Sequence, residues 1–282
     1  MVDIGVVLPS LAVQQDEKLD LAAAARHAED VGLASVWHGD HLAIGRPVLD
    51  LAIGLTVAAT ATKRVKIGAS VFVPAIRPLA WAAKQVASLQ YVSQGRLVLG
   101  LGSGGGAKQW EAAGVPFSQR GRRTDTALRL LPRLLAGEHV DEVGVALAPA
   151  VSRPPFWIGN ASAIAIERAV RYGDGWFPSL ITPEDVAKGA AKIGGRLTIA
   201  VGTTGRLGPD EDAKAEIAMG IAEAYGMPVE RAARIPITGT PREAAERIAA
   251  FQAAGADHLV FGLSGTDWRK QCELLAEARS LI

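Results

Sequence analysis

The sequence predicts a single (β/α)₈ barrel, and three observations support this α/β fold class. Short apolar runs alternate with longer amphipathic stretches, as in parallel strands that are covered by helices. The chain has 282 residues, close to the roughly 250 residues of one such barrel. Hydrophobic residues make up 49% of the chain, which allows a large core, and no linker interrupts it. We therefore expect one TIM-barrel domain over residues 1–282.

Eight apolar runs are the expected strands, and a stretch with helical periodicity follows each of them. The runs cover about 4–8, 34–37, 65–73, 96–101, 156–158, 175–177, 197–201 and 258–263. The helices are expected at about 16–31, 49–62, 79–92, 121–136, 161–172, 183–193, 240–254 and 266–280. Thr240 is a good N-cap for the seventh of these helices, and Pro241 fits its first position.

Two insertions interrupt this regular pattern. Residues at about 137–155 contain valines in near alternation and then three prolines, which predicts a short hairpin or excursion before the fifth strand. Residues at about 203–238 contain two further helical stretches, at about 210–225 and 228–234. The second insertion therefore follows the seventh strand.

Composition excludes several classes of function. The net charge is +1 and no polybasic run is present, so nucleic acid and membrane surfaces are not expected partners. Cys272 is the single cysteine, which excludes a disulfide scaffold and favours the reducing cytoplasm. The N-terminus lacks the pattern of a signal peptide, and no apolar run reaches the length of a membrane span. A cytoplasmic protein with a small-molecule substrate is expected.

The loops after the second, fourth and fifth strands carry the candidate site, because a barrel places its chemistry at the C-terminal ends of its strands. After the second strand, His38, Asp40 and His41 lie within four residues. Such a group is able to bind a metal, to transfer a proton beside a cofactor, or simply to cap a turn. Too few further ligands converge for a metal site, so we expect none.

The loop after the fourth strand is rich in glycine, including Gly102 and Gly104. Its match to the dinucleotide fingerprint falls at the wrong strand, so it indicates either close approach to a ligand or a tight bend. After the fifth strand, Gly159, Asn160, Ala161 and Ser162 lead into a helix. Free N–H groups at that helix N-terminus are able to bind a phosphate, although a simple Asn or Ser cap fits the sequence equally.

Taken in order, these segments resemble the luciferase-like flavin and deazaflavin oxidoreductases. The resemblance is carried by Trp37-His38-Gly39-Asp40-His41, Gly68-Ala69-Ser70-Val71, Arg77-Pro78, Ser93-Gln94-Gly95-Arg96-Leu97, Gly100-Leu101-Gly102-Ser103-Gly104, Gly114-Val115-Pro116-Phe117, Ile158-Gly159-Asn160-Ala161-Ser162, Asp174-Gly175-Trp176, Gly239-Thr240-Pro241 and Gly255-Ala256-Asp257-His258. No single motif is decisive, but the ordered series extends from the first strand to the last helix.

The resemblance implies a (β/α)₈ fold, often dimeric, and either FMN or the 5-deazaflavin coenzyme F-420 as the hydride carrier. It implies a non-proline cis peptide at the end of the third strand, at Ser70-Val71. It also implies that Asp40 and His41 contact the cofactor or the reacting centre, and we predict that His41 is a proton donor or a carbonyl-polarising group beside the ring. The remaining residues expected to bind the cofactor are His38, Ser70, Val71, Gly102, Gly104, Gly159, Asn160, Ala161 and Ser162.

Three functions follow from this resemblance. The first is hydride transfer between F-420 and a small organic substrate; the second is an FMN-dependent monooxygenase supplied with reduced flavin by a reductase partner. The third is a non-catalytic flavin-binding relative. Some F-420-dependent members carry a Trp after the Asp-His pair and an acid after the glycines, and both are absent here, which argues against a sugar-phosphate dehydrogenase. Four residues expected at the rim favour an apolar substrate; they are Ile44, Trp110, Trp176 and Phe177. A place in the core fits Trp176 equally.

Overall fold

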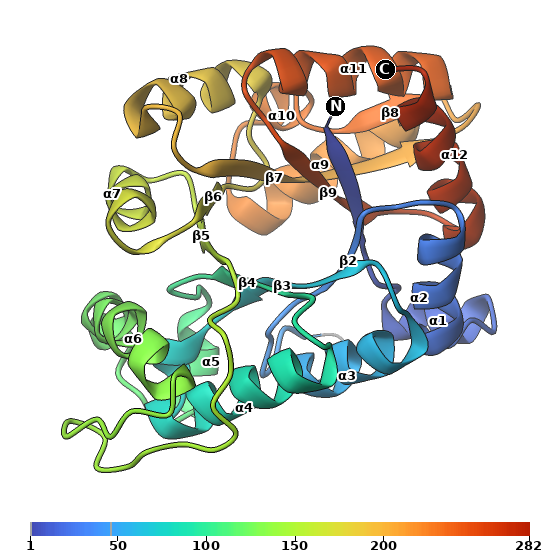
Figure 1. Ribbon diagram of the computed structural model, residues 1–282. Coiled ribbons are helices and arrows are strands. Elements are labelled where there is room, and N and C mark those ends of the chain that lie inside the picture. Colours follow the sequence, from blue (N-terminus) through green and yellow to red (C-terminus); the bar gives the residue numbers. More distant parts are fainter. Residues whose placement is uncertain (1, 46) are drawn as a thin grey trace.

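Eight parallel strands close into a barrel in the computed structural model, which describes residues 2–45 and 47–282 (Figure 1). The strands follow one another in chain order, and β9 closes the ring by pairing with both β7 and β1. The barrel strands are β1 (Asp3–Val7), β2 (Ser35–His38), β3 (Lys66–Phe72), β4 (Leu97–Leu101), β5 (Phe156–Gly159), β6 (Gly175–Phe177), β7 (Thr198–Leu207) and β9 (His258–Leu263). The predicted TIM-barrel fold is confirmed.

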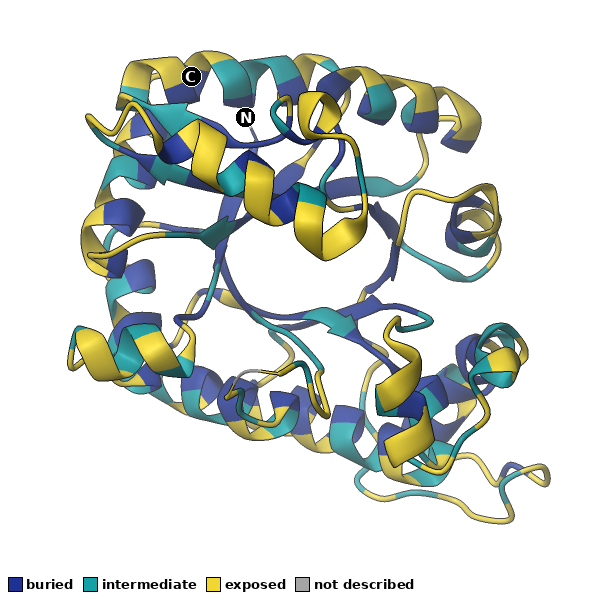
Figure 2. Ribbon diagram, turned by 180° about the vertical axis from the view of Figure 1, so that it is seen from behind, coloured by how far each residue is buried: buried dark blue, intermediate teal, exposed yellow. Residues whose placement is uncertain are grey.

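Helices connect the strands and surround the barrel, with their apolar sides buried against it and their polar sides exposed (Figure 2). They are α2 (Leu21–Asp30), α3 (Leu51–Ala61), α4 (Leu79–Val92), α6 (Arg120–Leu135), α7 (Ala163–Tyr172), α8 (Pro183–Ile193), α11 (Pro241–Ala253) and α12 (Trp268–Ser280). The predicted capping of α11 by Thr240 is confirmed, since Thr240 and Glu243 form a capping box. Within the described residues, no helix is long and apolar enough to cross a membrane.

The first connection differs from the prediction of one helix over about 16–31. The structure has α1 (Leu11–Asp16) and α2, separated by a short turn. Lys18 in this turn has a φ of 49°, and the Asp20 side chain accepts a hydrogen bond from Ala23 N at 2.7 Å. An aspartate in this position starts a new helix, because it satisfies a backbone N–H that has no partner within the helix.

Two short elements follow β4 where the sequence predicts a loop. They are α5 (Ala107–Ala112) and the 3₁₀ helix η2 (Phe117–Gln119), and a further 3₁₀ helix, η1 (Pro74–Ile76), follows β3. The segment between α6 and β5 contains one antiparallel bridge, between Val140 and Val145, which corresponds to the short hairpin expected there.

The insertion after β7 is anchored by strand pairing. β7 continues past the predicted end at 201 to Leu207, and its last residues pair with β8 (Ile237–Gly239). Helices α9 (Ala213–Tyr225) and α10 (Val229–Ala232) lie between these two strands. The helices match the prediction, whereas the longer β7 and the three-residue β8 correct it.

Large aromatic side chains fill the interior of the barrel. The rings of Trp37 and Trp157 stack with centroids 5.4 Å apart, and Phe177 lies 5.1 Å from Trp37. Glycines on neighbouring strands make room for these rings: a Cβ on Gly68 would collide with the Trp37 indole, and one on Gly175 with the Trp157 indole. The interior is therefore a packed core and not a channel, as is usual for this fold.

A buried polar network closes the N-terminal end of the barrel. Ser35 Oγ lies 2.8 Å from His258 Nε2 and accepts a hydrogen bond from Trp37 Nε1 at 2.6 Å. Asp3 Oδ2 lies 3.8 Å from His258 Nδ1. Burial lowers the pKa of His258 to about 4, although the nearby Asp3 carboxylate opposes this shift. His258 is therefore neutral at pH 7 and serves as a hydrogen-bonding part of the core.

Candidate functional site

The mouth of the barrel, meaning the C-terminal ends of its strands and the loops that follow them, is lined by glycine. A Cβ on Gly102 would collide with Val71 Cγ2, and a Cβ on Gly159 would lie 3.1 Å from Val71 Cγ1. The side chain of Val71 therefore lies between the ends of β4 and β5, above the aromatic core. Gly102 and Gly159 are buried, so their missing side chains make room for Val71, and the half-buried Val71 offers the apolar surface on which a flat ligand is able to rest.

The end of β3 has the irregular backbone that the resemblance implies. The Ser70-Val71 peptide bond is cis, and the pairing of β3 with β4 shifts register between Ala69 and Phe72. A Cβ on Gly39 would lie 3.6 Å from the Ser70 carbonyl oxygen, so the ends of β2 and β3 approach closely. The predicted cis peptide is confirmed, and Ser70 and Val71 lie at the mouth.

Asp40 is held in a buried ion pair with Arg77. Both carboxylate oxygens lie 2.7 Å from Arg77 Nη2, and Oδ2 also accepts a hydrogen bond from Val73 N at 2.8 Å. The Asp40 side chain is only 5% exposed. This carboxylate joins the loop after β2 to the segment after β3, so its first effect is to position the residues on either side of the mouth.

His41 lies at the mouth beside Gly39. A Cβ on Gly39 would lie 2.8 Å from His41 Nε2, which places the imidazole next to the end of β2. The residue is exposed, so its ring is accessible to a ligand. Gln109 Oε1 on α5 holds the following loop by accepting hydrogen bonds from Leu42 N and Ala43 N at 2.9 and 3.2 Å. Two residues that sequence reasoning did not place in the site, Arg77 and Gln109, therefore support the Asp40-His41 pair.

His38 lies apart from the other candidate residues. Its Nε2 is 3.3 Å from the Leu49 carbonyl oxygen, and a Cβ on Gly54 of α3 would lie 2.9 Å from its Cδ2. Burial lowers the pKa of His38. The structure thus places this imidazole between β2 and α3, outside the group of residues at the mouth.

Gly104 lies over a small apolar cluster beside the mouth. It has a φ of 65°, and a Cβ there would lie 2.9 Å from Val73 Cγ1 and 3.3 Å from Trp110 Nε1. Trp110 is fully buried beneath this loop. The glycine is needed both for the left-handed backbone and for the close packing.

Three of the predicted rim residues are core residues. The prediction that Trp110 and Phe177 line a substrate pocket is wrong, and of the two interpretations of Trp176 the core one is confirmed. Trp110 packs under the loop that contains Gly104, and Phe177 packs inside the barrel with its ring tilted against that of Trp37. Trp176 points toward α8, where a Cβ on Gly189 would collide with its ring. Side chains alternate across a strand, so Trp176 faces the helices while its neighbour Phe177 faces the barrel axis.

The loop after β5 caps helix α7 with its own side chains. Asn160 has a φ of 90°, and its Oδ1 accepts a hydrogen bond from Ser162 N at 2.9 Å. Ser162 Oγ accepts from Ala165 N at 3.3 Å. The backbone N–H groups of Ala163 and Ile164 have no acceptor among the residues that the structure describes. Capping and anion binding are therefore compatible, since the caps leave two N–H groups at the positive end of the helix dipole.

Across residues 2–45 and 47–282, no group of three or more His, Cys, Asp or Glu side chains is placed to hold a metal ion. The residues that meet at the mouth are suited instead to a flat, anionic organic ligand. Val71, packed over two buried glycines, offers an apolar surface, α7 offers N–H groups, and the exposed His41 offers an imidazole.

Comparison with known proteins shows the family. The family model described as luciferase-like monooxygenase matches residues 4–258. The chain is 31% identical over 196 residues to 5,10-methylenetetrahydromethanopterin reductase of Methanolobus tindarius, covering 64% of this chain and 59% of that protein. It is 32% identical over 174 residues to F-420-dependent glucose-6-phosphate dehydrogenase of Amycolatopsis mediterranei, covering 56% and 52%. The chain thus spans little more than half the length of the curated relatives that it matches.

Solved structures share the barrel at lower sequence identity. An F-420-dependent secondary alcohol dehydrogenase in complex with an F-420-acetone adduct superposes with a TM-score of 0.82 at 19% identity, covering 98% of both chains. The oxygenating constituent of 3,6-diketocamphane monooxygenase from Pseudomonas putida, in complex with FMN, superposes with a TM-score of 0.74 at 16% identity, covering 98% of this chain and 96% of the other. These two likenesses concern the fold.

Proposed function

The chain belongs to the luciferase-like monooxygenase family, and we propose that it is an oxidoreductase that uses coenzyme F-420 on a small, apolar organic substrate. The observation that supports a flavin-type ring is the smooth apolar surface of the half-buried Val71, which packs over the buried Gly102 and Gly159 at the mouth. A planar isoalloxazine-type ring requires such a smooth surface, and the two free N–H groups of α7 suit a cofactor phosphate. The choice of F-420 rests on the names of the relatives.

The chain's own residues would bind and orient the cofactor, while its ring would supply the hydride chemistry. Gly102, Gly159 and Val71 would support one face of the ring. His41 would hold or deliver a proton at its imidazole beside the reacting carbon, because a histidine titrates near neutral pH. Asp40, paired with Arg77, would fix the backbone from which His41 projects.

The names of related proteins support F-420 as the cofactor. Two of the relatives at 30–32% identity are named for dependence on F-420, namely a glucose-6-phosphate dehydrogenase and a hydroxymycolic acid dehydrogenase. Their substrates are chemically unlike each other. These two relatives therefore share a cofactor but not a substrate, and the apolar substrate stays a prediction.

An FMN-dependent monooxygenase is the second candidate. The matching family model is described as a luciferase-like monooxygenase, and a relative in fold carries FMN. That activity would need reduced flavin from a partner reductase. It would use the same mouth and the same phosphate position, so the site geometry alone favours neither cofactor over the other.

Titration with both cofactors distinguishes these candidates. Purified protein is titrated separately with F-420 and FMN, and the ring fluorescence is followed. The proposal expects F-420 to bind more tightly than FMN, with a dissociation constant below about 100 μM, equivalent to roughly 5.5 kcal/mol. Tighter binding of FMN would favour the monooxygenase, and the absence of binding by either below that concentration would contradict both.

We also propose that the chain forms a homodimer in the cytoplasm. Family members are often dimeric, and Trp81 and Tyr91 on α4 are 68% and 69% exposed, as contact residues of an interface would be in a free subunit. Light scattering on the purified protein at micromolar concentration tests this proposal, and a mass of 29.4 kDa would contradict it.

A further inference from the structure

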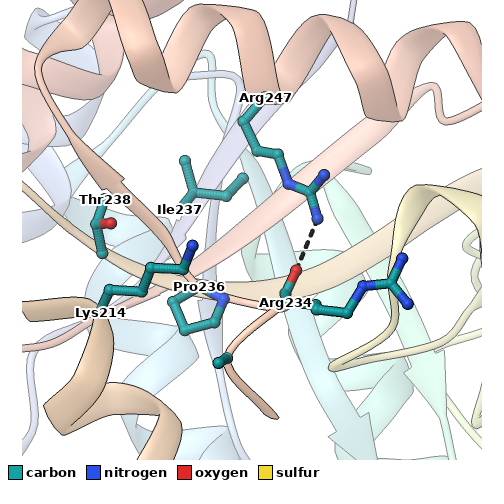
Figure 3. A pocket seen from close by; sticks show the side chains of 7 residues that line it. Lys214, Arg234, Pro236, Ile237, Thr238 and Arg247 are labelled. Carbon is teal, nitrogen blue, oxygen red and sulfur yellow. Dashed lines mark hydrogen bonds between the residues drawn. The ribbon is translucent and has the colours of Figure 1, made fainter. Parts of the chain in front are cut away.

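A pocket of about 320 Å³ lies on the insertion that follows β7 (Figure 3). Its walls come from the first turn of α9, the segment between α10 and β8, β8 itself and the middle of α11. The lining residues are Lys214, Ala233, Arg234, Pro236, Ile237, Thr238 and Arg247. None of them belongs to the group of residues at the mouth, so this basic pocket is a separate feature of the molecule.

Three of the lining residues are cations, and no carboxylate lines the pocket. Arg234 is partly neutralised, because its Nη2 lies 3.2 Å from Glu184 Oε2 on α8. In the part of the chain that the structure describes, neither Lys214 nor Arg247 has a carboxylate within ion-pair distance. The pocket therefore holds about two uncompensated positive charges.

Arg247 is fixed in place toward the pocket. Its Nη2 donates a hydrogen bond to the Arg234 carbonyl oxygen at 2.7 Å, and its guanidinium lies 5.5 Å from the Phe251 ring. In Figure 3 the side chains of Lys214 and Arg247 extend from opposite walls toward the space beside Pro236. A guanidinium has five N–H donors, so most of those on Arg247 remain available to a ligand.

The cations of the pocket also act on the neighbouring Glu184. A hydrogen bond from Thr182 lowers the pKa of Glu184, and the charges of Arg234 and Arg247 lower it further. The other lining residues include the apolar Pro236 and Ile237 and the hydroxyl-bearing Thr238. A ligand that matches these features carries about two negative charges and a small apolar body.

We propose that this basic pocket is a binding site for a small organic phosphate, separate from the site at the mouth. A phosphate monoester carries about 1.5 to 2 negative charges at pH 7, which matches the net charge of the three cations of the pocket beside the single carboxylate of Glu184. The planar fork of an arginine pairs with two phosphate oxygens at once, and an ammonium group adds a further contact. Thr238 supplies a hydroxyl donor on the adjoining wall.

Calorimetric titration of the full chain with inorganic phosphate at low ionic strength tests the site. The proposal expects saturable binding that Lys214→Gln weakens about fivefold to tenfold, because one charge-assisted contact is lost. Lys192→Gln is the matched control, since Lys192 is an exposed lysine on α8 outside the pocket, and it should bind phosphate as the unchanged protein does. Arg247→Gln should abolish binding, with folding checked by its melting curve.

Several results would overturn the proposal. The proposal is overturned if no saturable binding is seen up to about 50 mM phosphate, because that concentration is well above the millimolar dissociation constants of ordinary weak sites. Equal affinity in Lys214→Gln and the unchanged protein would instead place the phosphate elsewhere, for example at the N-terminus of α7. Equal weakening in Lys192→Gln would indicate a general charge effect. Tighter binding of succinate than of phosphate would contradict the phosphate class. If Arg247→Gln does not fold, the two lysine variants decide the question.

Discussion

The inward-facing residues at the two ends of the barrel differ in size and polarity. At the N-terminal end, Trp37, Ser35 and His258 contact one another through hydrogen bonds and ring packing. At the mouth, Gly102 directly follows the C-terminal end of β4, and Gly159 is the last residue of β5. One end therefore satisfies its own polar groups, whereas the other leaves a surface that a ligand can complete.

This difference indicates that residues at one end of the strands stabilise the fold and residues at the other end bind the ligand. A substitution at the N-terminal end should change the free energy of unfolding and leave ligand binding alone. A substitution at the mouth should do the reverse, as is usual for a fold whose active sites are built on loops. The four predictions below test this separation, beginning with the largest effect.

Replacement of His41 by alanine should reduce turnover about 10²- to 10⁴-fold, the usual contribution of a general acid or base. The dissociation constant for the cofactor and the melting temperature should change little, since His41 is exposed at the mouth. Steady-state kinetics and fluorescence titration measure the two quantities. His139→Ala, at an exposed histidine next to the short hairpin, is the control. Unchanged turnover in His41→Ala would instead mean that His41 only shapes the loop.

Replacement of Gly5 by alanine should destabilise the fold by about 3 kcal/mol, because it overfills the N-terminal end. The new Cβ would collide with Ser35 Oγ and lie 2.7 Å from Trp37 Nε1. Urea unfolding measures the loss. Gly220→Ala, in α9 with no atom near its Cβ position, is the control and should be neutral or slightly stabilising. Equal stability of the two variants would show that the N-terminal end is not tightly packed.

Acid should destabilise the protein through His258. The folded-state pKa of about 4 lies below the unfolded value of 6.5 because of burial, so stability is full above pH 6.5 and falls toward pH 4. The total loss from this residue is about 3 kcal/mol at most, from 1.36 kcal/mol per unit of pKa. Urea unfolding at pH 7, 5.5 and 4.5 measures the slope. His258→Gln should flatten it, and His139→Gln should not; an unaltered slope in His258→Gln would contradict the assignment.

Replacement of Gly159 by aspartate should weaken cofactor binding about tenfold, because it places a carboxylate beside the proposed phosphate position on α7. Because Gly159 is buried, the melting temperature should also fall, and a melting curve checks that the variant is folded during the titration. Gly159→Ala separates charge from size, since its Cβ would lie 3.1 Å from Val71 Cγ1 and 3.3 Å from the Leu101 carbonyl oxygen. Fluorescence titration compares the two variants. If both bind the cofactor equally, no phosphate lies at this helix.

The periodic parts of the molecule were predictable, and the short or long-range parts were not. The apolar runs and the capping box of Thr240 carry local signals that define barrel strands and α11. The three residues of β8 are too few for a periodic signal. The Asp40–Arg77 pair joins residues 37 positions apart, and Gln109 contacts Leu42 across 67 positions. No local sequence pattern predicts either contact, because both depend on the folded chain.

Alternation of side chains along a strand predicts the orientation of His38, expected from the sequence to bind the cofactor, and decides between the rim and core interpretations of Trp176. Ser35 and Trp37 face the barrel interior, so His38 on the same strand must face the helices, as it does against Gly54. The same rule places Trp176 outward when Phe177 points inward. Counting inward positions along each strand would have separated core residues from residues at the mouth.

The long strand β7 has a consequence for how such a protein can be re-engineered. Its first residues close the barrel against β6 and β9, while Gly205, Arg206 and Leu207 pair with β8 beyond the rim. Residues 208–236 therefore form an insertion cassette whose two ends are held together by the pairing of β7 with β8. Exchange of that cassette for one of another length would leave the pairing that closes the barrel intact. The ligands bound by the insertion could therefore be changed without altering the barrel.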